Sequence, residues 1–352
     1  MTSRERAEVA LRGRIPDRVP VVPLIDTSYA AACYGVPVSE CFLKPEVHAR
    51  ALVSTLERHP GIDGFSINIG LTPEVISKQT ESESDYFVTT VDGTDWQIPK
   101  NDIGTPTRRG ITRFDDERLR HVELLRPHIV ETLRLIPRTI LDDYDVSAGL
   151  TSPFSEIVFM MGIERALVAM HEEPAALKQA IEFRVPLALR WVEEMAALGV
   201  PSIWLGEGLA SSSLISSRQY AEFVLPYEQR LTARLRELGV PSVLHICGKA
   251  DGILEAIASS GVDCFETDWQ VELAEAKTRI GNRVALKGNL HTTRLVQSSP
   301  DDIYREACRA IECAKSGGGF ILSSGCALGR DTPPKNVDAM VRAARDVGTY
   351  LT

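Results

Sequence analysis

Several features that mark membrane, secreted and nucleic-acid-binding proteins are missing from this sequence. It has no run of 18 apolar residues and no N-terminal apolar segment of the kind that directs secretion. It has no excess of basic residues either, because 39 Lys and Arg stand against 48 Asp and Glu, giving a net charge of −9. Binding to a phosphate backbone needs a basic surface, so we expect no nucleic-acid partner and no association with a membrane.

The seven cysteines form no C-x-x-C pair and no regular framework. A disulfide-rich secreted domain or a structural zinc knuckle would show such spacing. Scattered cysteines suit a reducing compartment, where they are ligands or small core residues. With 44% apolar residues to build a large core, the sequence predicts a cytoplasmic globular protein.

Two short stretches stand out, SVLHICG at residues 242–248 and GGFILSSGC at residues 318–326. In the first, His245 and Cys247 are two positions apart, and side chains at that spacing on a strand point to the same side. The second stretch ends in Cys326. One imidazole and two thiolates are ligands that zinc prefers, with a fourth position left for chemistry. A core histidine beside two buried free cysteines is the alternative interpretation.

Short apolar runs alternate with helical segments along the whole chain. Eight runs are expected to be strands, near residues 19–24, 64–69, 145–149, 202–205, 242–246, 264–267, 283–289 and 320–323. No linker or compositional break interrupts them, so the pattern predicts an α/β fold in which residues 1–352 form a (β/α)8 TIM barrel as a single domain. An open, doubly wound sheet is the alternative, but no G-x-G-x-x-G follows the first run.

Two segments fall outside this alternation. Residues 4–11 predict a short helix in an N-terminal extension. Between Tyr86 and Ile98, two alternating runs flank Asp92-Gly93, a dipeptide typical of a hairpin turn. We expect this hairpin, near residues 86–98, to be an excursion from the barrel and not a second domain.

The strands of a TIM barrel carry their active-site groups at their carboxyl ends, on one rim. His245 and Cys247 end the fifth predicted strand, Cys326 follows the eighth, and Glu207 follows the fourth. These four residues are the candidate catalytic residues and metal ligands. Three further residues on the same rim are candidates to contact a cofactor: Asp268, Asn289 and His291.

Short motifs distributed along the chain resemble those of the uroporphyrinogen decarboxylase superfamily of barrels. Their order and spacing carry the resemblance, which covers essentially the whole chain. The motifs are PDRVP at 16–20, TSPF at 151–154, ASSSLIS at 210–216, FVLPY at 223–227, HICG at 245–248, KGN at 287–289, GCAL at 325–328 and TPPKNV at 332–337.

Within that superfamily the chain resembles the corrinoid-dependent methyltransferases and not the decarboxylases. The decarboxylases hold substrate carboxylates with an Arg in the loop after the first strand, whereas residues 24–32 contain no Arg. Methylcobamide:thiol methyltransferases carry zinc on a His-x-Cys and a distant Cys. That pattern maps onto His245, Cys247 and Cys326, so the resemblance implies a Zn²⁺ site at these three residues.

The resemblance implies a reaction as well as a metal. A methyl group would move between a corrinoid (methylcobamide) and a thiol such as coenzyme M. Zinc would hold the thiol as a thiolate, which would attack the methyl group. Glu207 would be a fourth zinc ligand or would hydrogen-bond to one of the other ligands. The sequence lacks Asp-x-His-x-x-Gly, the motif by which corrinoid-carrying domains ligate cobalt. We therefore expect the corrinoid to arrive on a transiently bound partner protein.

One stretch departs from the thiol methyltransferases, many of which resemble Asp-Pro-x-Ala-Ser where this chain has EGLAS at residues 207–211. Related enzymes that demethylate methoxylated aromatics show two spaced Glu residues followed by a His, an arrangement that Glu207, Glu222 and His245 approximate. An O-demethylase on the methyl-donor side, with Glu222 as a candidate ligand, is therefore an alternative. A uroporphyrinogen-type decarboxylase and a non-catalytic metal-binding or corrinoid-chaperone protein are the others.

Overall fold

The computed structural model describes residues 1–350, and a parallel sheet forms its centre. Seven strands follow one another in the order β1-β6-β7-β8-β9-β10-β11, each paired in parallel with the next. They are β1 (Gly64–Ile67), β6 (Asp145–Thr151), β7 (Ser202–Gly206), β8 (Ser242–Ile246), β9 (Cys264–Thr267), β10 (Ala285–Leu290) and β11 (Phe320–Ser324). Each of them coincides with one of the predicted strands.

The segment at residues 19–24, predicted as the first strand, lies between the two edges of this sheet. Val21 forms a parallel bridge to β11, and on its other side its carbonyl accepts a hydrogen bond of 2.7 Å from Asp63 N, next to β1. Pro20 and Pro23 have no N–H group, so the segment cannot form a continuous ladder. It closes the curled sheet, and the predicted TIM-barrel fold is confirmed.

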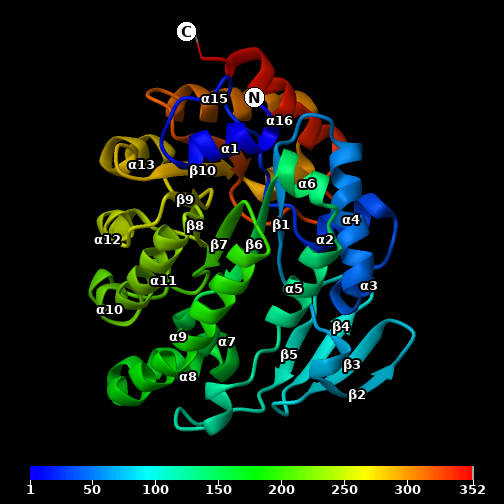
Figure 1. Ribbon diagram of the computed structural model, residues 1–352, viewed down its shortest axis with the longest axis vertical. Coiled ribbons are helices and arrows are strands. Elements are labelled where there is room, and N and C mark those ends of the chain that lie inside the picture. Colours follow the sequence, from blue (N-terminus) through cyan, green and yellow to red (C-terminus); the bar gives the residue numbers. More distant parts are fainter. Residues whose placement is uncertain (351–352) are drawn as a thin grey trace.

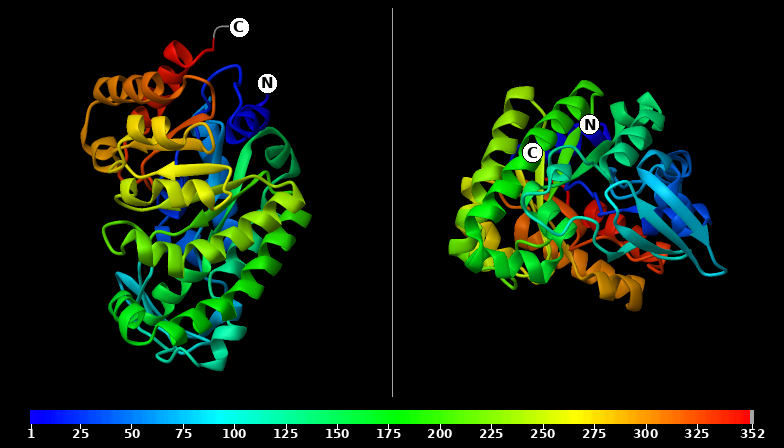
Figure 2. Two further views of the ribbon diagram at one scale, coloured as in Figure 1. Left: turned by 90° about the vertical axis from the view of Figure 1, so that its left-hand side faces the viewer. Right: turned by 90° about the horizontal axis from the view of Figure 1, so that it is seen from below.

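Helices follow the strands and surround the sheet (Figures 1 and 2). The predicted N-terminal helix is α1 (Ser3–Leu11), and Gly162, whose φ is 93°, separates two later helices of the chain. No helix in residues 1–350 is both long and apolar enough to cross a bilayer. The others are α2 (Thr27–Tyr34), α3 (Val38–Leu43), α4 (Pro45–Arg58), α5 (Arg126–Leu135), α6 (Arg138–Asp143), α7 (Pro153–Met161), α8 (Ile163–Glu172), α9 (Pro174–Ala197), α10 (Ser217–Phe223), α11 (Leu225–Leu238), α12 (Leu254–Ser259), α13 (Leu273–Ile280), α14 (Thr292–Gln297), α15 (Pro300–Ala314) and α16 (Pro334–Val347).

The predicted hairpin is present and belongs to a larger sheet. Strands β3 (Asp85–Thr90) and β4 (Asp95–Pro99) pair antiparallel, and Gly93 has the positive φ of 82° that this turn requires. Strands β2 (Ile76–Glu81) and β5 (Thr105–Arg108) extend the hairpin to four strands. Their residues are mostly exposed and polar, so they lack the alternation that marks β3 and β4. In Figure 1 this sheet lies beside α5, at the opposite end of the molecule from the chain termini.

A buried pair of histidines joins α4 to α5. His48 Nδ1 and His128 Nε2 lie 3.0 Å apart, and both side chains are inaccessible to solvent. Burial lowers the pKa of both imidazoles, to about 4 for His128. Both rings are therefore neutral in the folded protein at pH 7.

We expect His128 to contribute a loss of stability as the pH falls from 7 to 5. His128 has a lower pKa in the folded chain than the ordinary value of 6.5, so the unfolded chain binds more protons and is favoured by acid. This one group lowers the unfolding free energy at pH 5, relative to pH 7, by about 2 kcal/mol, measured by urea denaturation at the two pH values. His128→Gln should remove this contribution and His121→Gln, at an exposed position, should retain it. If the change in stability between pH 7 and pH 5 is the same in His128→Gln as in the unsubstituted protein, this account is wrong.

Candidate metal centre and active site

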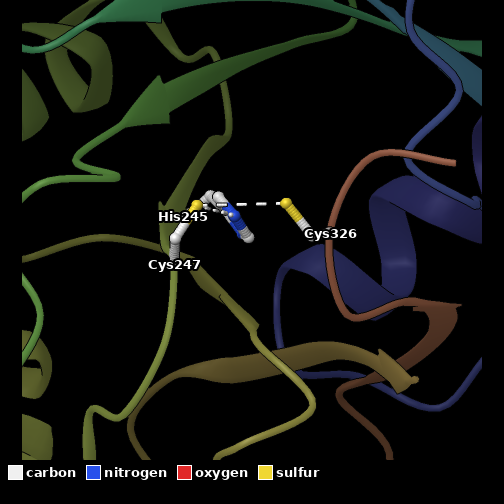
Figure 3. A group of neighbouring side chains, drawn as sticks. All are labelled: His245, Cys247 and Cys326. Carbon is white, nitrogen blue, oxygen red and sulfur yellow. Dashed lines mark hydrogen bonds between the residues drawn. The ribbon is translucent and has the colours of Figure 1, made fainter. Parts of the chain in front are cut away.

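The carboxyl ends of β8 and β11 bring His245, Cys247 and Cys326 together (Figure 3). One ligand atom from each residue lies within 4.8 Å of the other two. Cys247 Sγ is 3.2 Å from His245 Nε2 and 3.9 Å from Cys326 Sγ. The imidazole is buried and the two thiols are half-buried. All three side chains therefore face one point on the barrel rim.

Glu266 in β9 fixes the orientation of the His245 ring. The His245 Nδ1 atom lies 3.3 Å from Glu266 Oε2 and 3.2 Å from the Glu266 backbone oxygen. The same carboxylate accepts a hydrogen bond of 2.7 Å from Trp204 Nε1 and pairs with Lys287 Nζ at 2.9 Å. With Nδ1 donating to these acceptors, Nε2 is the ring nitrogen that faces the two sulfur atoms.

Hydrogen bonds within the cluster favour a thiolate on Cys326. Interactions first with Cys247 and then with His245 lower the pKa of Cys326 to about 5. The pKa of Cys247 is raised, because its thiol proton is held in the bond to Cys326 and because it is buried. Burial acts to lower the pKa of His245, but Cys326 and Glu266 more than offset it and raise that pKa. One imidazole nitrogen and two sulfur atoms, with the imidazole oriented by a carboxylate, are a donor set that fits Zn²⁺.

A cavity of about 390 Å³ adjoins the cluster. Its wall includes the three cluster residues and the carboxyl ends of β6 and β7, and it continues to Trp96 and Pro106 of the four-stranded sheet. Most of the lining side chains are apolar. This volume and lining are typical of a small-molecule site.

Glu207 lies next to the cluster but does not belong to it. Its backbone N–H donates to the His245 carbonyl at 2.9 Å, while its carboxyl group accepts a hydrogen bond of 2.6 Å from Ser155 Oγ. Among residues 1–350, the atoms grouped within 4.8 Å are those of His245, Cys247 and Cys326 without Glu207. Burial raises the pKa of Glu207 to about 8, so the group is largely protonated at pH 7. Glu222 lies at the surface of α10 and pairs with Lys178 at 2.7 Å.

The three other rim candidates have local partners. Asn289 Nδ2 donates to the backbone oxygen of Asp268 at 3.2 Å, and the Asp268 side chain is buried. His291 begins α14, and its ring stacks on that of Trp269 with 3.8 Å between the centroids. In the described part of the chain, none of these three residues is among those that line the cavity.

Two buried charged residues, Glu266 and Lys287, were not predicted as site residues. Both lie inside apolar strand runs, and buried charges in such runs are tolerated when they are paired. A charged residue inside an apolar strand run can be seen in the sequence, so this pattern could have identified both residues. No comparable pattern in the sequence indicates that Trp96 lines the cavity, because its position depends on how the four-stranded sheet packs on the barrel rim.

The sequence matches the uroporphyrinogen decarboxylase (URO-D) family over residues 2–347. The chain belongs to the uroporphyrinogen decarboxylase family. Among curated URO-D relatives, a methylated-thiol–coenzyme M methyltransferase of Methanosarcina mazei is 32% identical over 198 residues, covering 56% of this chain and 52% of that relative. The chain thus spans about half of that protein.

Other URO-D relatives match over the full length. The methylcobamide:CoM methyltransferase MtaA of Methanosarcina barkeri is 25% identical over 353 residues, covering 98% of both chains. The uroporphyrinogen decarboxylase of Anaeromyxobacter dehalogenans is 26% identical over 356 residues, covering 96% of this chain and 97% of that one. A solved structure of a methyltransferase from Methanosarcina mazei has a TM-score of 0.82 at 22% identity over 98% of this chain and 99% of its own, which supports the fold. The predicted family is confirmed, and it is a family of enzymes.

Replacing Glu266 by Gln should lower the free energy of unfolding by about 3 kcal/mol, because the buried Lys287 charge would lose its partner. The Glu266→Gln/Lys287→Met double variant should regain part of that loss. Glu275→Gln is the matched control, since it removes one member of an exposed pair with Arg279 and should cost less than about 1 kcal/mol. Urea denaturation measures all three variants. A Glu266→Gln protein as stable as the unsubstituted one would show that this carboxylate does not hold the barrel interior together.

Proposed function

We propose that this chain is a zinc-dependent methyltransferase that moves a methyl group between a corrinoid and a thiol. The corrinoid is carried by a partner protein that binds transiently. The observation that carries the proposal is the grouping of His245, Cys247 and Cys326 on the wall of a small-molecule cavity. The names of the methylcobamide:CoM relatives support the same reaction class.

In this proposal His245 Nε2 and the two cysteine sulfur atoms hold Zn²⁺. Bound zinc would supply the positive charge that keeps a substrate thiol deprotonated at neutral pH. Glu266 keeps the imidazole in the tautomer that leaves Nε2 free. The fourth ligand position is left to the substrate, and the Glu207 carboxyl group accepts a hydrogen bond from Ser155, which lines the cavity. The mostly apolar wall limits access of water to the reacting sulfur.

The corrinoid-carrying partner protein would bind at the barrel rim. His291 and the exposed Trp269 lie on it, beyond the ends of β9 and β10, and with Asp268 and Asn289 they are our candidates to contact the corrinoid or its carrier. The chain's main contribution to the rate would then be to position the methyl donor and the acceptor thiol relative to each other.

The charges in the cavity wall argue against decarboxylation of a substrate with several carboxylates. Among residues 1–350, the arginines that line the cavity are Arg126 and Arg184, and both pair with Glu156, at 2.9 and 2.8 Å. Asp26 adds a further acid to the wall. A substrate with several carboxylates would find no unpaired cation in this lining.

Removal of a methyl group from a methoxylated aromatic is the second candidate, and the apolar character of the cavity favours it. The same three residues would hold zinc, which would act on the ether oxygen. The two candidates differ in the direction of transfer. In the first, the methyl group passes from the corrinoid to a thiol, and in the second it passes from the methoxylated aromatic to the corrinoid.

The purified, zinc-loaded protein should transfer the methyl group of free methylcobalamin to at least one member of a thiol panel. The loss of methylcobalamin absorbance and the thioether mass report the reaction, and cob(I)alamin with methoxyarenes tests the second candidate. Turnover should fall at least about a hundredfold in Cys247→Ala/Cys326→Ala, whereas Cys313→Ala, at an exposed position in α15, should keep it. Zinc-loaded protein that is inactive in both assays would contradict the proposal.

A further inference from the structure

Asp26 places a carboxylate oxygen on the wall of the rim cavity. Its Oδ1 atom caps α2 by accepting hydrogen bonds from Ser28 N at 3.0 Å and Tyr29 N at 3.5 Å. Its other oxygen, Oδ2, has no hydrogen-bond partner within residues 1–350 and is not among the polar atoms that are closed off from solvent. The residue is only 8% exposed and lines the cavity, so the open side of this carboxylate lies on that space.

The helix cap alone does not account for an aspartate at this position. Ser, Thr and Asn also cap a helix with one oxygen, and they do so without a charge. Burying a carboxylate is costly unless a cation or enough donors compensate it. Burial raises the pKa of Asp26 to about 7, so the protein itself does not fully compensate the ionised form.

The other charges of the wall are balanced. In the described chain, the Asp, Glu, Lys and Arg residues that line the cavity are Asp26, Arg126, Glu156 and Arg184. Both arginines pair with Glu156, at 2.9 and 2.8 Å, and Arg126 also pairs with Glu123. Two cations therefore face two carboxylates, and Asp26 is left as the wall's unbalanced charge.

Asp26 lies on the same side of the cavity as Cys326. The backbone just before it runs beside the loop that carries this cysteine: Leu24 N donates to Ser324 Oγ at 3.1 Å, and Leu328 N donates to the Leu24 carbonyl at 2.9 Å. Asp26 and Cys326 both line the cavity and interact electrostatically. A small molecule with its sulfur at the candidate metal centre can therefore present a second group to Asp26.

We propose that the thiol that binds at this site carries an ammonium group, and that this group pairs with Asp26 while the sulfur lies at the metal centre. This inference rests on the proposed thiol methylation and names the class of thiol, an aminothiol. Zn²⁺ held by two thiolates has no net charge, so the ammonium group offsets the charge that Asp26 leaves unbalanced. Asp26 is then a specificity-determining residue, which favours a cation at the end of the substrate and disfavours an anion.

Calorimetric binding of benzylammonium and benzyl alcohol tests the pairing without thiol or methyl transfer. The two probes share a ring that suits the apolar wall and differ in charge. At pH 8, where Asp26 is ionised and the ammonium group is protonated, the cation should bind at least about tenfold more tightly. The preference should persist in Cys247→Ala/Cys326→Ala, which lacks the sulfur atoms that can themselves attract a cation. Equal or tighter binding of the alcohol to this variant would overturn the proposal.

Asp26→Asn removes the charge and keeps an oxygen that caps α2. It should weaken benzylammonium binding about tenfold and change benzyl alcohol binding by less than about twofold. Asp331→Asn is the matched control, because it removes the same charge from an exposed position in the loop after Cys326, outside the cavity wall. Asp26→Ser, which also keeps a capping oxygen, replaces the amide variant if circular dichroism shows that the latter does not fold. Equal effects of the substitutions at positions 26 and 331 would contradict a role for Asp26 in binding.

A turnover assay separates this inference from the proposed function. 2-Aminoethanethiol and 2-mercaptoethanol have the same length and end in a cation and a neutral group. The ratio of their kcat/KM values should fall about tenfold in Asp26→Asn, and the different acidities of the two thiols cancel in this comparison. Turnover with an unchanged ratio, or a preference of the unsubstituted protein for 2-mercaptoethanesulfonate, would overturn the inference and leave the proposed function intact. If no thiol reacts but benzylammonium binds through Asp26, the proposed thiol methylation fails and the cation site stands.

Discussion

The buried carboxylate of Glu266 connects five adjacent strands of the barrel. It belongs to β9, and its contacts reach Trp204 in β7, His245 in β8, Lys287 in β10 and Ser323 in β11. A buried carboxylate is stable only when charges and donors surround it, so these strands must stay in register for the barrel to fold. The same contacts orient the imidazole of the candidate metal centre, so one interaction serves both the fold and the site.

The order of the barrel strands brings the three residues of the candidate metal centre together. The cavity beside them also needs the four-stranded sheet, which forms part of its wall. Parallel strands place His245, Cys247 and Cys326 on one rim because their carboxyl ends meet there. The four-stranded sheet then supplies Trp96 and Pro106 to the cavity wall. Under the proposed function, the chemistry depends on residues fixed by strand order, and the shape of the substrate cavity depends in part on the added sheet.

Much of the fold could be predicted from the sequence, because alternating apolar runs and helical segments are local signals. The first strand was less regular than predicted, since its prolines prevent a continuous ladder, and β2 and β5 were missed because exposed polar strands show no alternation. The three cluster residues could be predicted from strand position. The placement of Glu207 toward Ser155 could not, because it depends on which face of a short loop points into the barrel.

The central claim is that His245, Cys247 and Cys326 hold zinc and leave one position open to a thiol. X-ray absorption at the zinc edge tests it most directly, since sulfur and nitrogen ligands differ in number and distance. The account predicts two sulfur ligands and one imidazole nitrogen in the zinc-loaded protein, a third sulfur ligand after addition of a thiol that the protein methylates, and loss of sulfur ligation in Cys247→Ala/Cys326→Ala. Zinc surrounded only by nitrogen and oxygen, or a sulfur count that does not change when the thiol is added, would contradict it.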